Sequence, residues 1–397
     1  MLDQVLVINA GSSSLKYQLV DPRTGRSTAS GLVERIGDSG SNVQHTHGQE
    51  QTTRELDCPD HTTAFAALRE AFATHGPDLA TASVGAVGHR VVHGGDRFAG
   101  PTVIDDAVIE AIHRVAALAP LHNPANVQGI EAARRTFPEL SHVAVFDTAF
   151  HATMPLAATE YAVPRAWRTD YGVRKYGFHG TSHAYVSRRV AALLDRPLEE
   201  VNSIVLHLGN GASACAVAGG HSVDTSMGLS PTDGLVMGTR TGDLDPSVAG
   251  HLSAVADLSV TDFTTAINKR SGLLGMTGSG DFRELMAKVD AGEEAAQTAY
   301  AVVVHRIVRH VGALAAPLGR LDAVAFTAGV GENTPRLRAD VLTSLAIFGL
   351  NVDRQANDQA RGETRISPSG STPAAFVIPT NEEFEIARQC QQVLGEA

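Results

Sequence analysis

Two short polar loops in this chain have the residue types that bind phosphate, and they lie half a chain apart. The first is GSSSLK, from Gly11 to Lys16, and the second is GNGAS, from Gly209 to Ser213. Small residues in such loops leave backbone N–H groups and hydroxyls available to surround phosphate oxygens. Lys16, one of only four lysines, adds a cation, although it could also be a solvated strand residue. The repetition favours phosphate binding over two unrelated turns.

Two arginines stand where a cation needs an anionic partner. Arg90 lies in the apolar stretch GHRVVHGG, where an unpaired guanidinium would be costly. Its partner is either a ligand or an Asp or Glu in a structural salt bridge, and the motif alone leaves both open. Arg240 lies in the Gly/Thr-rich run from Ser226 to Pro246. With Lys16, these arginines can neutralise a phosphoryl group in transfer, whose charge is spread over three oxygens.

Three side chains with oxygen donors, Asn9, Asp147 and Glu382, follow or end predicted strands. Such groups hold Mg²⁺ directly or through water. Asp147 could instead cap the following turn, and Glu382 could be a first-turn acid favoured by the helix dipole. His45 and His47 also alternate as metal ligands do, but no third ligand follows at a useful spacing, so we expect surface residues.

Hairpins must position the two loops. The segments Leu6–Asp21 and Ser203–Gly220 each run from an apolar β-branched stretch through the loop into a second alternating stretch. A Walker P-loop is unlikely because GxxxxGK[ST] is missing and a strand pattern follows Lys16. Two such halves facing each other would form a cleft for a nucleotide. The chain is therefore predicted to be a duplicated α/β phosphotransferase.

Other predicted elements place the remaining candidates. A helix should begin near Asp106 with Asp105 as its N-cap, and a buried strand should end at Asp147, at the carboxyl edge where open α/β sheets bind ligands. His179 directly precedes a predicted helix, whose N-terminal N–H groups favour anions. The segment Ala323–Arg338 predicts a strand, a glycine turn and a helix with Asn333 as its cap.

Bulk properties narrow the class of protein. A chain of 397 residues predicts two domains, and the formal net charge of −11 argues against a nucleic-acid surface. We see no N-terminal leader and no apolar run approaching the roughly 20 residues needed to span a bilayer. Three widely spaced cysteines predict free thiols. These features predict a cytoplasmic protein with small-molecule partners and without nucleic-acid or membrane partners.

At this point the motifs resemble those of the acetate kinase (acetokinase) family, in the same order and over nearly the whole chain. The matching segments are NAGSSSLK, GHRVVHGG, APLHNPAN, FDTAFH, YGFHGTSH, HLGNGAS, MGTRTGD, AGVGEN and PTNEE. The resemblance implies two duplicated ribonuclease-H-like domains of the actin, Hsp70 and sugar-kinase superfamily, with the nucleotide in an interdomain cleft. It implies that residues 1–150 plus 380–397 form one domain, which binds phosphate, Mg²⁺ and acetate. Residues 151–379 would form a second domain, which binds the nucleotide.

The resemblance also implies residue roles. Arg90, Asp147, His179 and Arg240 would be catalytic, with His179 and Arg240 stabilising the transition state. The acetate would be bound by Arg90, Val92, Leu121, His122, Phe178 and Pro231. The nucleotide would be held by Ser12, Ser14, Lys16, His207, Leu208, Gly209, Asn210, Gly211, Asp281, Phe282, Arg283, Gly329, Val330, Gly331, Glu332 and Asn333. Asn9 and Glu382 would bind Mg²⁺, with Mn²⁺ as an alternative.

The implied reaction is reversible phosphoryl transfer from ATP to acetate, giving acetyl phosphate and ADP. A carboxylic acid with a pKa of about 4.3 is already ionised at neutral pH, so the acceptor needs no general base. We therefore interpret Asp147 as an organiser of magnesium, water or an arginine. A propionate or butyrate kinase is the nearest alternative and an Hsp70-like or actin-like nucleotide switch a remote one. The resemblance further implies a homodimer. Closure of the two domains around ATP would exclude water, and segments 150–155 and 368–379 are the hinge candidates.

Overall fold

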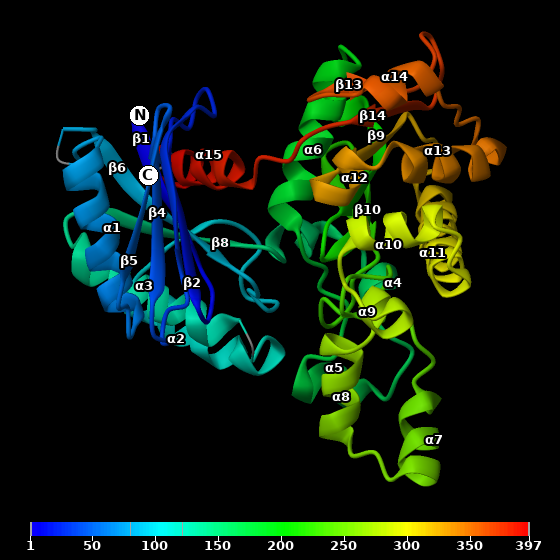
Figure 1. Ribbon diagram of the computed structural model, residues 1–397, viewed down its shortest axis with the longest axis horizontal. Helices are drawn as coiled ribbons and strands as arrows, with labels where there is room; N and C mark the ends of the chain where they lie inside the picture. The colour runs from blue at the N-terminus through cyan, green and yellow to red at the C-terminus, as the bar shows by residue number, and fades with distance from the viewer. Residues whose placement is uncertain (1, 80, 121, 396–397) are drawn as a thin grey trace. The chain divides into compact units, whose positions relative to one another are not determined.

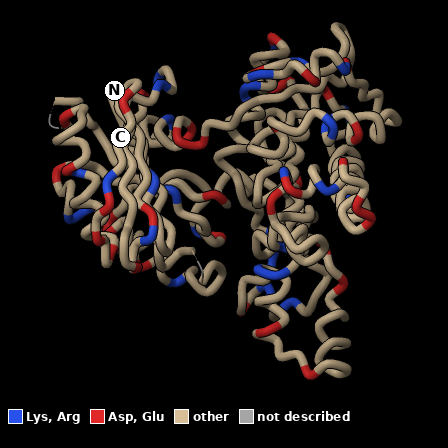
Figure 2. The backbone as a smooth tube through the Cα atoms, viewed as in Figure 1, with Lys and Arg blue, Asp and Glu red and all other residues tan. Residues whose placement is uncertain are grey.

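The computed structural model describes residues 2–79, 81–120 and 122–395, which divide into two compact units (Figure 1). Unit 1 comprises Met1–Phe150 with Asn381–Ala397, and unit 2 comprises His151–Thr380. Leu121 lies outside the described residues. Figure 2 shows that Lys and Arg are interspersed with Asp and Glu along the backbone of each unit.

Unit 1 contains an eight-stranded mixed sheet in the order β5-β4-β3-β2-β1-β6-β8-β7. The predicted first hairpin is confirmed as β1 and β2, with the GSSS loop at its tip. β6 and β8 continue the sheet parallel to β1. The strands are β1 (Gln4–Ala10), β2 (Ser14–Val20), β3 (Ser27–Glu34), β4 (Ser41–His47), β5 (Glu50–Leu56), β6 (Val84–Val91), β7 (Thr102–Val103) and β8 (Ser141–Phe146).

Alternation along β1 gives this sheet two apolar faces. Leu6 and Ile8 pack into a core with α1 and α3, whereas Val5 and Val7 pack on the other face with α15. Figure 1 shows α1 and α15 on opposite sides of the strands. The predicted N-cap Asp105 of α2 is confirmed. The helices are α1 (His61–His75), α2 (Asp106–Arg114), η1 (Val115–Leu118), α3 (Asn123–Thr136) and α15 (Glu382–Gly395), and the short η2 (Ala149–Thr153) ends the unit.

Unit 2 contains a six-stranded mixed sheet in the order β11-β10-β9-β12-β14-β13. The predicted second hairpin is confirmed as β9 and β10, and β12 and β14 continue the sheet parallel to β9. Both sheets share one pattern of antiparallel strands followed by parallel strands, which runs through β3-β2-β1-β6-β8 in unit 1 and β11-β10-β9-β12-β14 in unit 2. The predicted α/β class with two similar domains is therefore confirmed. The strands are β9 (Asn202–Leu208), β10 (Ala212–Ala218), β11 (His221–Thr225), β12 (Ala323–Thr327), β13 (Thr364–Arg365) and β14 (Ala374–Val377).

Helices cover both faces of this second sheet, with α6 on one face and α11 on the other (Figure 1). His179 is the N-cap of α6, as predicted. The helices are α4 (Leu156–Thr159), α5 (Arg165–Tyr171), α6 (Gly180–Leu193), η3 (Leu198–Glu200), α7 (Ser247–Ala256), α8 (Val260–Lys269), α9 (Gly272–Thr277), α10 (Phe282–Asp290), α11 (Glu294–Leu318), α12 (Ala328–Asn333), α13 (Pro335–Ser344), η4 (Ala346–Phe348) and α14 (Arg354–Gln359).

The long helix α11 corrects the expectation that no apolar run approaches the length of a membrane span. By length and composition alone its 25 residues pass that test. However, one face of α11 packs against β9, β10 and β11. The helix also carries Arg306, Arg309 and His310, which contact Asp243 of the same unit. A core helix of a soluble domain fits these contacts, because cations paired to a loop carboxylate belong in a water-accessible protein rather than in lipid.

Three local predictions were wrong. AGVGEN is not a glycine turn but the helix α12, and the N-cap of the next helix is Thr334 rather than Asn333, with Pro335 in its first turn. His45 is buried rather than at the surface, because its Nδ1 and Nε2 contact the Tyr17 hydroxyl and the Gly76 carbonyl at 2.9 and 2.8 Å.

The cysteine prediction is confirmed, since Cys58, Cys215 and Cys390 are free and buried. The two units join at residues 150/151 and 380/381. The segment predicted as the second hinge, 368–379, contains the buried strand β14, so four of its residues are part of the sheet of unit 2. Whether either segment bends stays a prediction.

Candidate active site

Three candidates of unit 1 lie at the carboxyl ends of adjacent parallel strands. Asn9 is near the end of β1, Arg90 near the end of β6, and Asp147 directly follows β8. The register pairs Ile8 with His89 and Val91 with Phe146, so the three positions fall at one edge of the sheet. This edge is where open α/β sheets bind ligands.

Arg90 and Asp147 form a two-point ion pair. The Nε of Arg90 donates to Oδ1 of Asp147 at 3.0 Å, and Nη2 donates to Oδ2 at 2.7 Å. The Arg90 side chain is 24% exposed and that of Asp147 only 2%. The sequence left a salt bridge or a ligand open as the partner of Arg90, and the structure contains the salt bridge. Nη1 of Arg90 makes no hydrogen bond within the described part of the chain.

The two-point hydrogen bonding keeps this pair charged. Asp147 raises the pKa of Arg90, and Glu382 and Glu383 add to the rise. Burial raises the pKa of Asp147, Arg90 opposes this rise and Glu382 adds to it, and the pKa lies above its usual value. Since both carboxylate oxygens accept hydrogen bonds from a guanidinium that stays protonated, the pair is ionic at neutral pH.

A small cavity of about 90 Å³ collects the charged candidates of unit 1. Its lining includes Asn9, Lys16, Arg90 and Glu382. The ammonium of Lys16 forms an ion pair with Glu383, which follows Glu382 in the first turn of α15. Ser12 lies exposed at the adjacent hairpin tip, and Ser14 begins β2. The structure therefore gathers the predicted metal and phosphate residues of this unit.

The donor set at this edge fits a hard divalent cation. Glu382 lines the cavity together with Asn9, and its charge raises the pKa of Asp147. Oxygen donors of this kind suit Mg²⁺, which usually takes one or two carboxylates and completes its shell with water and substrate phosphates. Accordingly, no three His, Cys, Asp or Glu side chains gather into a closed metal cluster among the residues described.

Two predicted acetate residues of unit 1, Val92 and His122, belong to segments that reach the same edge. Val92 is partly buried just after β6, and its backbone N–H donates to Oδ1 of Asn126 at 3.1 Å. His122 is exposed before α3. Asn126 also donates to the carbonyl of Ala10 at 2.7 Å, which ties β6, α3 and the end of β1 together. Sequence reasoning missed this bridging asparagine, because only the strand register reveals its role.

In unit 2, His179 and Arg240 converge on the second polar loop. His179 has left-handed backbone angles, φ 58° and ψ 29°, a conformation that costs energy and clusters at functional sites. A Cβ built on Gly211 would lie 3.5 Å from Nε2 of His179 and 3.7 Å from Nη1 of Arg240. Both predicted transition-state residues therefore face the tip of the β9–β10 hairpin.

The loop that carries Arg240 is fixed from two sides. Nη1 of Arg240 donates to the carbonyl of Pro231 at 2.8 Å, which also places that predicted acetate residue. The backbone N–H of Asp243 donates to the carbonyl of Gly234 at 2.9 Å, and the N–H of Gly234 donates to Oδ1 of Asp243 at 3.0 Å. Asp243 also forms an ion pair with Arg309 of α11 at 2.6 Å. Burial lowers the pKa of Arg240, yet arginine remains protonated in proteins.

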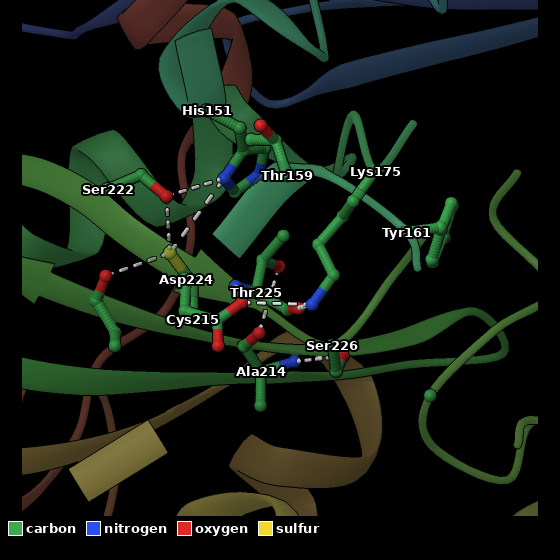
Figure 3. Close-up of polar contacts among 12 residues, drawn as sticks. His151, Thr159, Tyr161, Lys175, Ala214, Cys215, Ser222, Asp224, Thr225 and Ser226 are labelled. Carbon is green, nitrogen blue, oxygen red and sulfur yellow. Dashed lines mark hydrogen bonds and ion pairs between the residues drawn. The ribbon is translucent and has the colours of Figure 1, made fainter. Parts of the chain in front are cut away.

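A second support holds the backbone that precedes His179. The carbonyl of Phe178 accepts from Nε2–H of His151 at 2.9 Å, and Nδ1 of that ring then accepts from the hydroxyl of Ser222 at 2.8 Å. Figure 3 shows the contact between His151 and Ser222, with Cys215 beside it and the Lys175–Asp224 ion pair nearby. Phe178 is buried, and His151 was not predicted as part of the site.

The predicted nucleotide residues of unit 2 line a cavity of about 1160 Å³. Those that it brings together are Leu208, Gly209, Asn210, Asp281, Phe282, Arg283, Gly329, Val330 and Asn333, whereas His207, Gly211, Gly331 and Glu332 do not line it. His207 lies at the end of β9, where its ring stacks on His179 with centroids 4.2 Å apart. The cavity is large enough for a nucleoside phosphate.

Sequence reasoning missed the apolar wall of this cavity. Met286, Val303 and Ile307 contribute from α10 and α11, and Met237 and Leu273 from the loop and helix opposite. Each belongs to an ordinary apolar helix stripe or loop, so nothing in the sequence separates it from core. The combination of a flat apolar wall and loop N–H groups suits an aromatic base attached to phosphate.

Comparison with known proteins agrees with these motifs. Residues 4–388 match the profile of the Acetokinase family. The acetate kinase of Clavibacter michiganensis is 55% identical over 386 residues, covering 97% of this chain and 98% of that protein. A solved structure of Porphyromonas gingivalis acetate kinase is 40% identical with a TM-score of 0.94, covering 99% of this chain and 100% of that one. A propionate kinase from Francisella tularensis is 41% identical with a TM-score of 0.92, covering 98% and 99%.

Proposed function

The chain belongs to the acetokinase family, and from this premise we propose that it catalyses reversible phosphoryl transfer from ATP to acetate, giving acetyl phosphate and ADP. The observation that carries the proposal is the Arg90–Asp147 pair at the carboxyl edge of the unit 1 sheet. A guanidinium held in one plane by a carboxylate, with Nη1 still available, suits the planar carboxylate of an acyl acceptor.

The roles of the unit 1 residues follow from charge. Acetate is ionised at neutral pH and attacks as the carboxylate, so the site needs positioning and charge neutralisation rather than a base. Arg90 binds the carboxylate and Asp147 orients Arg90. Val92, Leu121 and His122 contact the rest of the small acid. Asn9 and Glu382 hold Mg²⁺ or Mn²⁺, with Ser12, Ser14 and Lys16 on the phosphates. A metal ion held by these residues would neutralise part of the phosphate charge.

The roles of the unit 2 residues follow from the cavity and the loops. Residues of the β9–β10 loop, Asp281–Arg283 and the start of α12 hold the nucleotide. The same proposal gives His207, Gly211, Gly331 and Glu332 further contacts to the nucleotide. His179 and Arg240 place hydrogen-bond donors on the phosphoryl oxygens, where negative charge is greatest during in-line transfer. Phe178 and Pro231 contact the methyl end of the acid.

A propionate kinase is the second candidate, because such an enzyme is among the similar structures. One methylene in an apolar pocket changes binding by only about 1–3 kcal/mol, so small shifts of lining side chains can change the preferred acid. The 55% identity to an acetate kinase favours acetate. Family membership leaves a nucleotide switch without support.

The test is a hydroxylamine-trapping assay for acyl phosphate with MgATP and acetate, propionate or butyrate. We expect the highest kcat/KM with acetate. A higher value with propionate or butyrate would keep the chemistry and change the substrate. No acyl phosphate with any of the acids would refute the kinase assignment.

The proposal includes a homodimer formed through unit 2. Large apolar side chains on its helices are exposed, and they include Val255 of α7 at 65% and Val260 of α8 at 80%. Helices α7 and α8 have no buried residue within the protomer, which is unusual unless another surface covers them. Light scattering should give twice the protomer mass of 41.7 kDa. Val260→Asp should shift it toward one protomer, and a wild-type monomer would contradict the dimer.

We also propose that the enzyme acts in the cytoplasm. Its three cysteines are free and buried, which suits a reducing compartment where ATP is plentiful. Fractionation of cells with an antibody against the chain tests this placement, and recovery from the membrane or secreted fraction would contradict it.

A further inference from the structure

A buried histidine without an assigned role lies one helical turn beyond His179. His183, four residues along α6, is completely buried. Its Nε2 is 2.8 Å from the hydroxyl oxygen of Ser213 on β10. Its Nδ1 has no hydrogen-bond partner within the described part of the chain. Burial lowers the pKa of His183 well below its usual value, so the ring is neutral and carries one proton.

The same hydroxyl also contacts His179. Oγ of Ser213 is 2.9 Å from Nδ1 of His179, and Ser213 itself is completely buried. A hydroxyl has one proton to donate and lone pairs to accept. If Ser213 accepted from both rings, its own buried proton would have no acceptor among the described residues, so it donates to one ring and accepts from the other. The direction of this short chain then decides which nitrogen of His179 carries a proton.

The orphan nitrogen of His183 sets the direction. If Ser213 donated to Nε2 of His183, the proton of that ring would be on Nδ1, leaving a buried N–H without an acceptor. In the opposite direction, Nε2–H of His183 donates to Ser213 and only a lone pair on Nδ1 is left unmatched. Buried acceptors without partners occur more often than buried N–H groups without partners. The second arrangement is therefore the stable one.

We propose that His183 and Ser213 are positioning residues that hold His179 in its Nε2–H tautomer. The chain runs from Nε2–H of His183 to Oγ of Ser213, and from the Ser213 hydroxyl to Nδ1 of His179. His179 then presents an N–H, not a lone pair, on the edge that faces Gly211 and Arg240. The value of this edge for phosphoryl transfer rests on the proposed function.

The tautomer has a chemical consequence for that reaction. An N–H at Nε2 donates to a phosphoryl oxygen as its charge develops, whereas a lone pair there would repel the oxygen. Removing Ser213 should therefore slow turnover more than it weakens substrate binding. Partners that orient metal-bound histidines typically contribute about 10–100-fold to activity, and we expect an effect of that order for His179.

The direct test is the tautomer itself. The wild-type protein, labelled with ¹⁵N-histidine, is studied by long-range ¹H–¹⁵N correlation, and the His179 signals are identified by their loss in His179→Asn. We expect the Nε2–H pattern in the wild type and a shift toward Nδ1–H in Ser213→Ala. An Nδ1–H pattern in the wild type would overturn the proposal, even if Ser213→Ala did not fold.

The second test compares two buried serine hydroxyls of unit 2. The control, Ser187→Ala, removes a hydroxyl of α6 that donates to the carbonyl of Ala184 at 3.0 Å and, within the described part of the chain, makes no hydrogen bond to a residue of the proposed site. Ser213→Ala should lower kcat about 10–100-fold with KM values for ATP and acetate within about twofold, while Ser187→Ala leaves kcat nearly unchanged. Equal losses in both variants would refute a specific role. The NMR result does not depend on the substrate, so it separates this proposal from the acyl phosphate assay.

Discussion

Asp147 binds Arg90 through both of its carboxylate oxygens, with hydrogen bonds of 3.0 Å to Nε and 2.7 Å to Nη2. This relationship fixes the plane of the guanidinium and leaves Nη1 for a ligand. It also gives Asp147 a task that requires no proton transfer, which is consistent with an acceptor that is already ionised. The first prediction follows from this pair.

Asp147→Asn should lower kcat/KM for acetate at least about 100-fold. Asparagine keeps an oxygen acceptor but lacks the charge, and breaking a buried ion pair costs about 3–5 kcal/mol. Kinetics with the acyl phosphate assay and a thermal melt check the result. Asp106→Asn is the control, because Asp106 pairs with Arg134 at the surface with its side chain 94% exposed. Unchanged kinetics in Asp147→Asn would remove Asp147 from the site.

Arg240→Ala should lower kcat about 100-fold or more and raise the acetate KM much less. Its donors are assigned to phosphoryl oxygens in the transition state, and such an interaction contributes to kcat rather than to ground-state binding. Asp243, rather than Arg240, holds the loop to α11, so the variant should fold. Arg270→Ala, an exposed arginine nearby, is the control. Unchanged turnover would rule out the assignment.

Gly329→Ala should raise the KM for ATP while leaving the melting temperature equal or slightly higher. A Cβ there would meet nothing within 4 Å, and alanine is a better helix residue than glycine by about 1 kcal/mol. The added methyl would enter the nucleotide cavity. Gly250→Ala in α7 is a matched control, since it also has open space and lies outside that cavity. If both variants keep the wild-type KM, the nucleotide does not approach Gly329.

Unit 2 should lose stability as the pH falls from about 6.5 toward 4. Burial lowers the pKa of His151 to about 4, although its bond to the Phe178 carbonyl opposes the shift. The unfolded chain, with a histidine pKa near 6.5, binds the proton first, so the contribution of about 3 kcal/mol is complete above pH 6.5 and declines below it.

Urea unfolding followed across this pH range measures the effect of His151. His151→Asn should flatten the pH dependence of the midpoint, whereas His47→Gln, at an exposed position, should leave it unchanged. A wild-type midpoint that does not move between pH 6.5 and 4.5 would contradict a neutral buried His151.

The hairpins and caps were predictable because their signals are local. Alternation on both sides of GSSS and GNGA specified the two hairpins, and Asp105 has the spacing of an N-cap. His179 was correctly placed before α6, although its left-handed backbone was not foreseen. The edge position of Asp147 followed from a general property of α/β sheets.

The errors came from contacts between distant segments. AGVGEN forms α12 partly because the buried Arg338 donates to the carbonyls of Gly331 and Glu332 at 2.9 and 2.7 Å, which satisfies the end of a glycine-rich helix. His45 is buried because Tyr17 supplies a hydroxyl. The link from His183 through Ser213 to His179 likewise depends on how α6 packs on β9 and β10, which no local pattern encodes.

The order in which the chain emerges during synthesis gives α15 a particular importance. This helix covers the Val5 and Val7 face of unit 1, and Ile386 and Cys390 lie so close to β6 that a Cβ at Gly88 would be 2.8 Å from each. Its residues are made after all of unit 2. The nascent chain must therefore carry a half-covered sheet, with an apolar surface open to chaperones or to other chains, until α15 leaves the ribosome. Unit 1 starts first and is completed last.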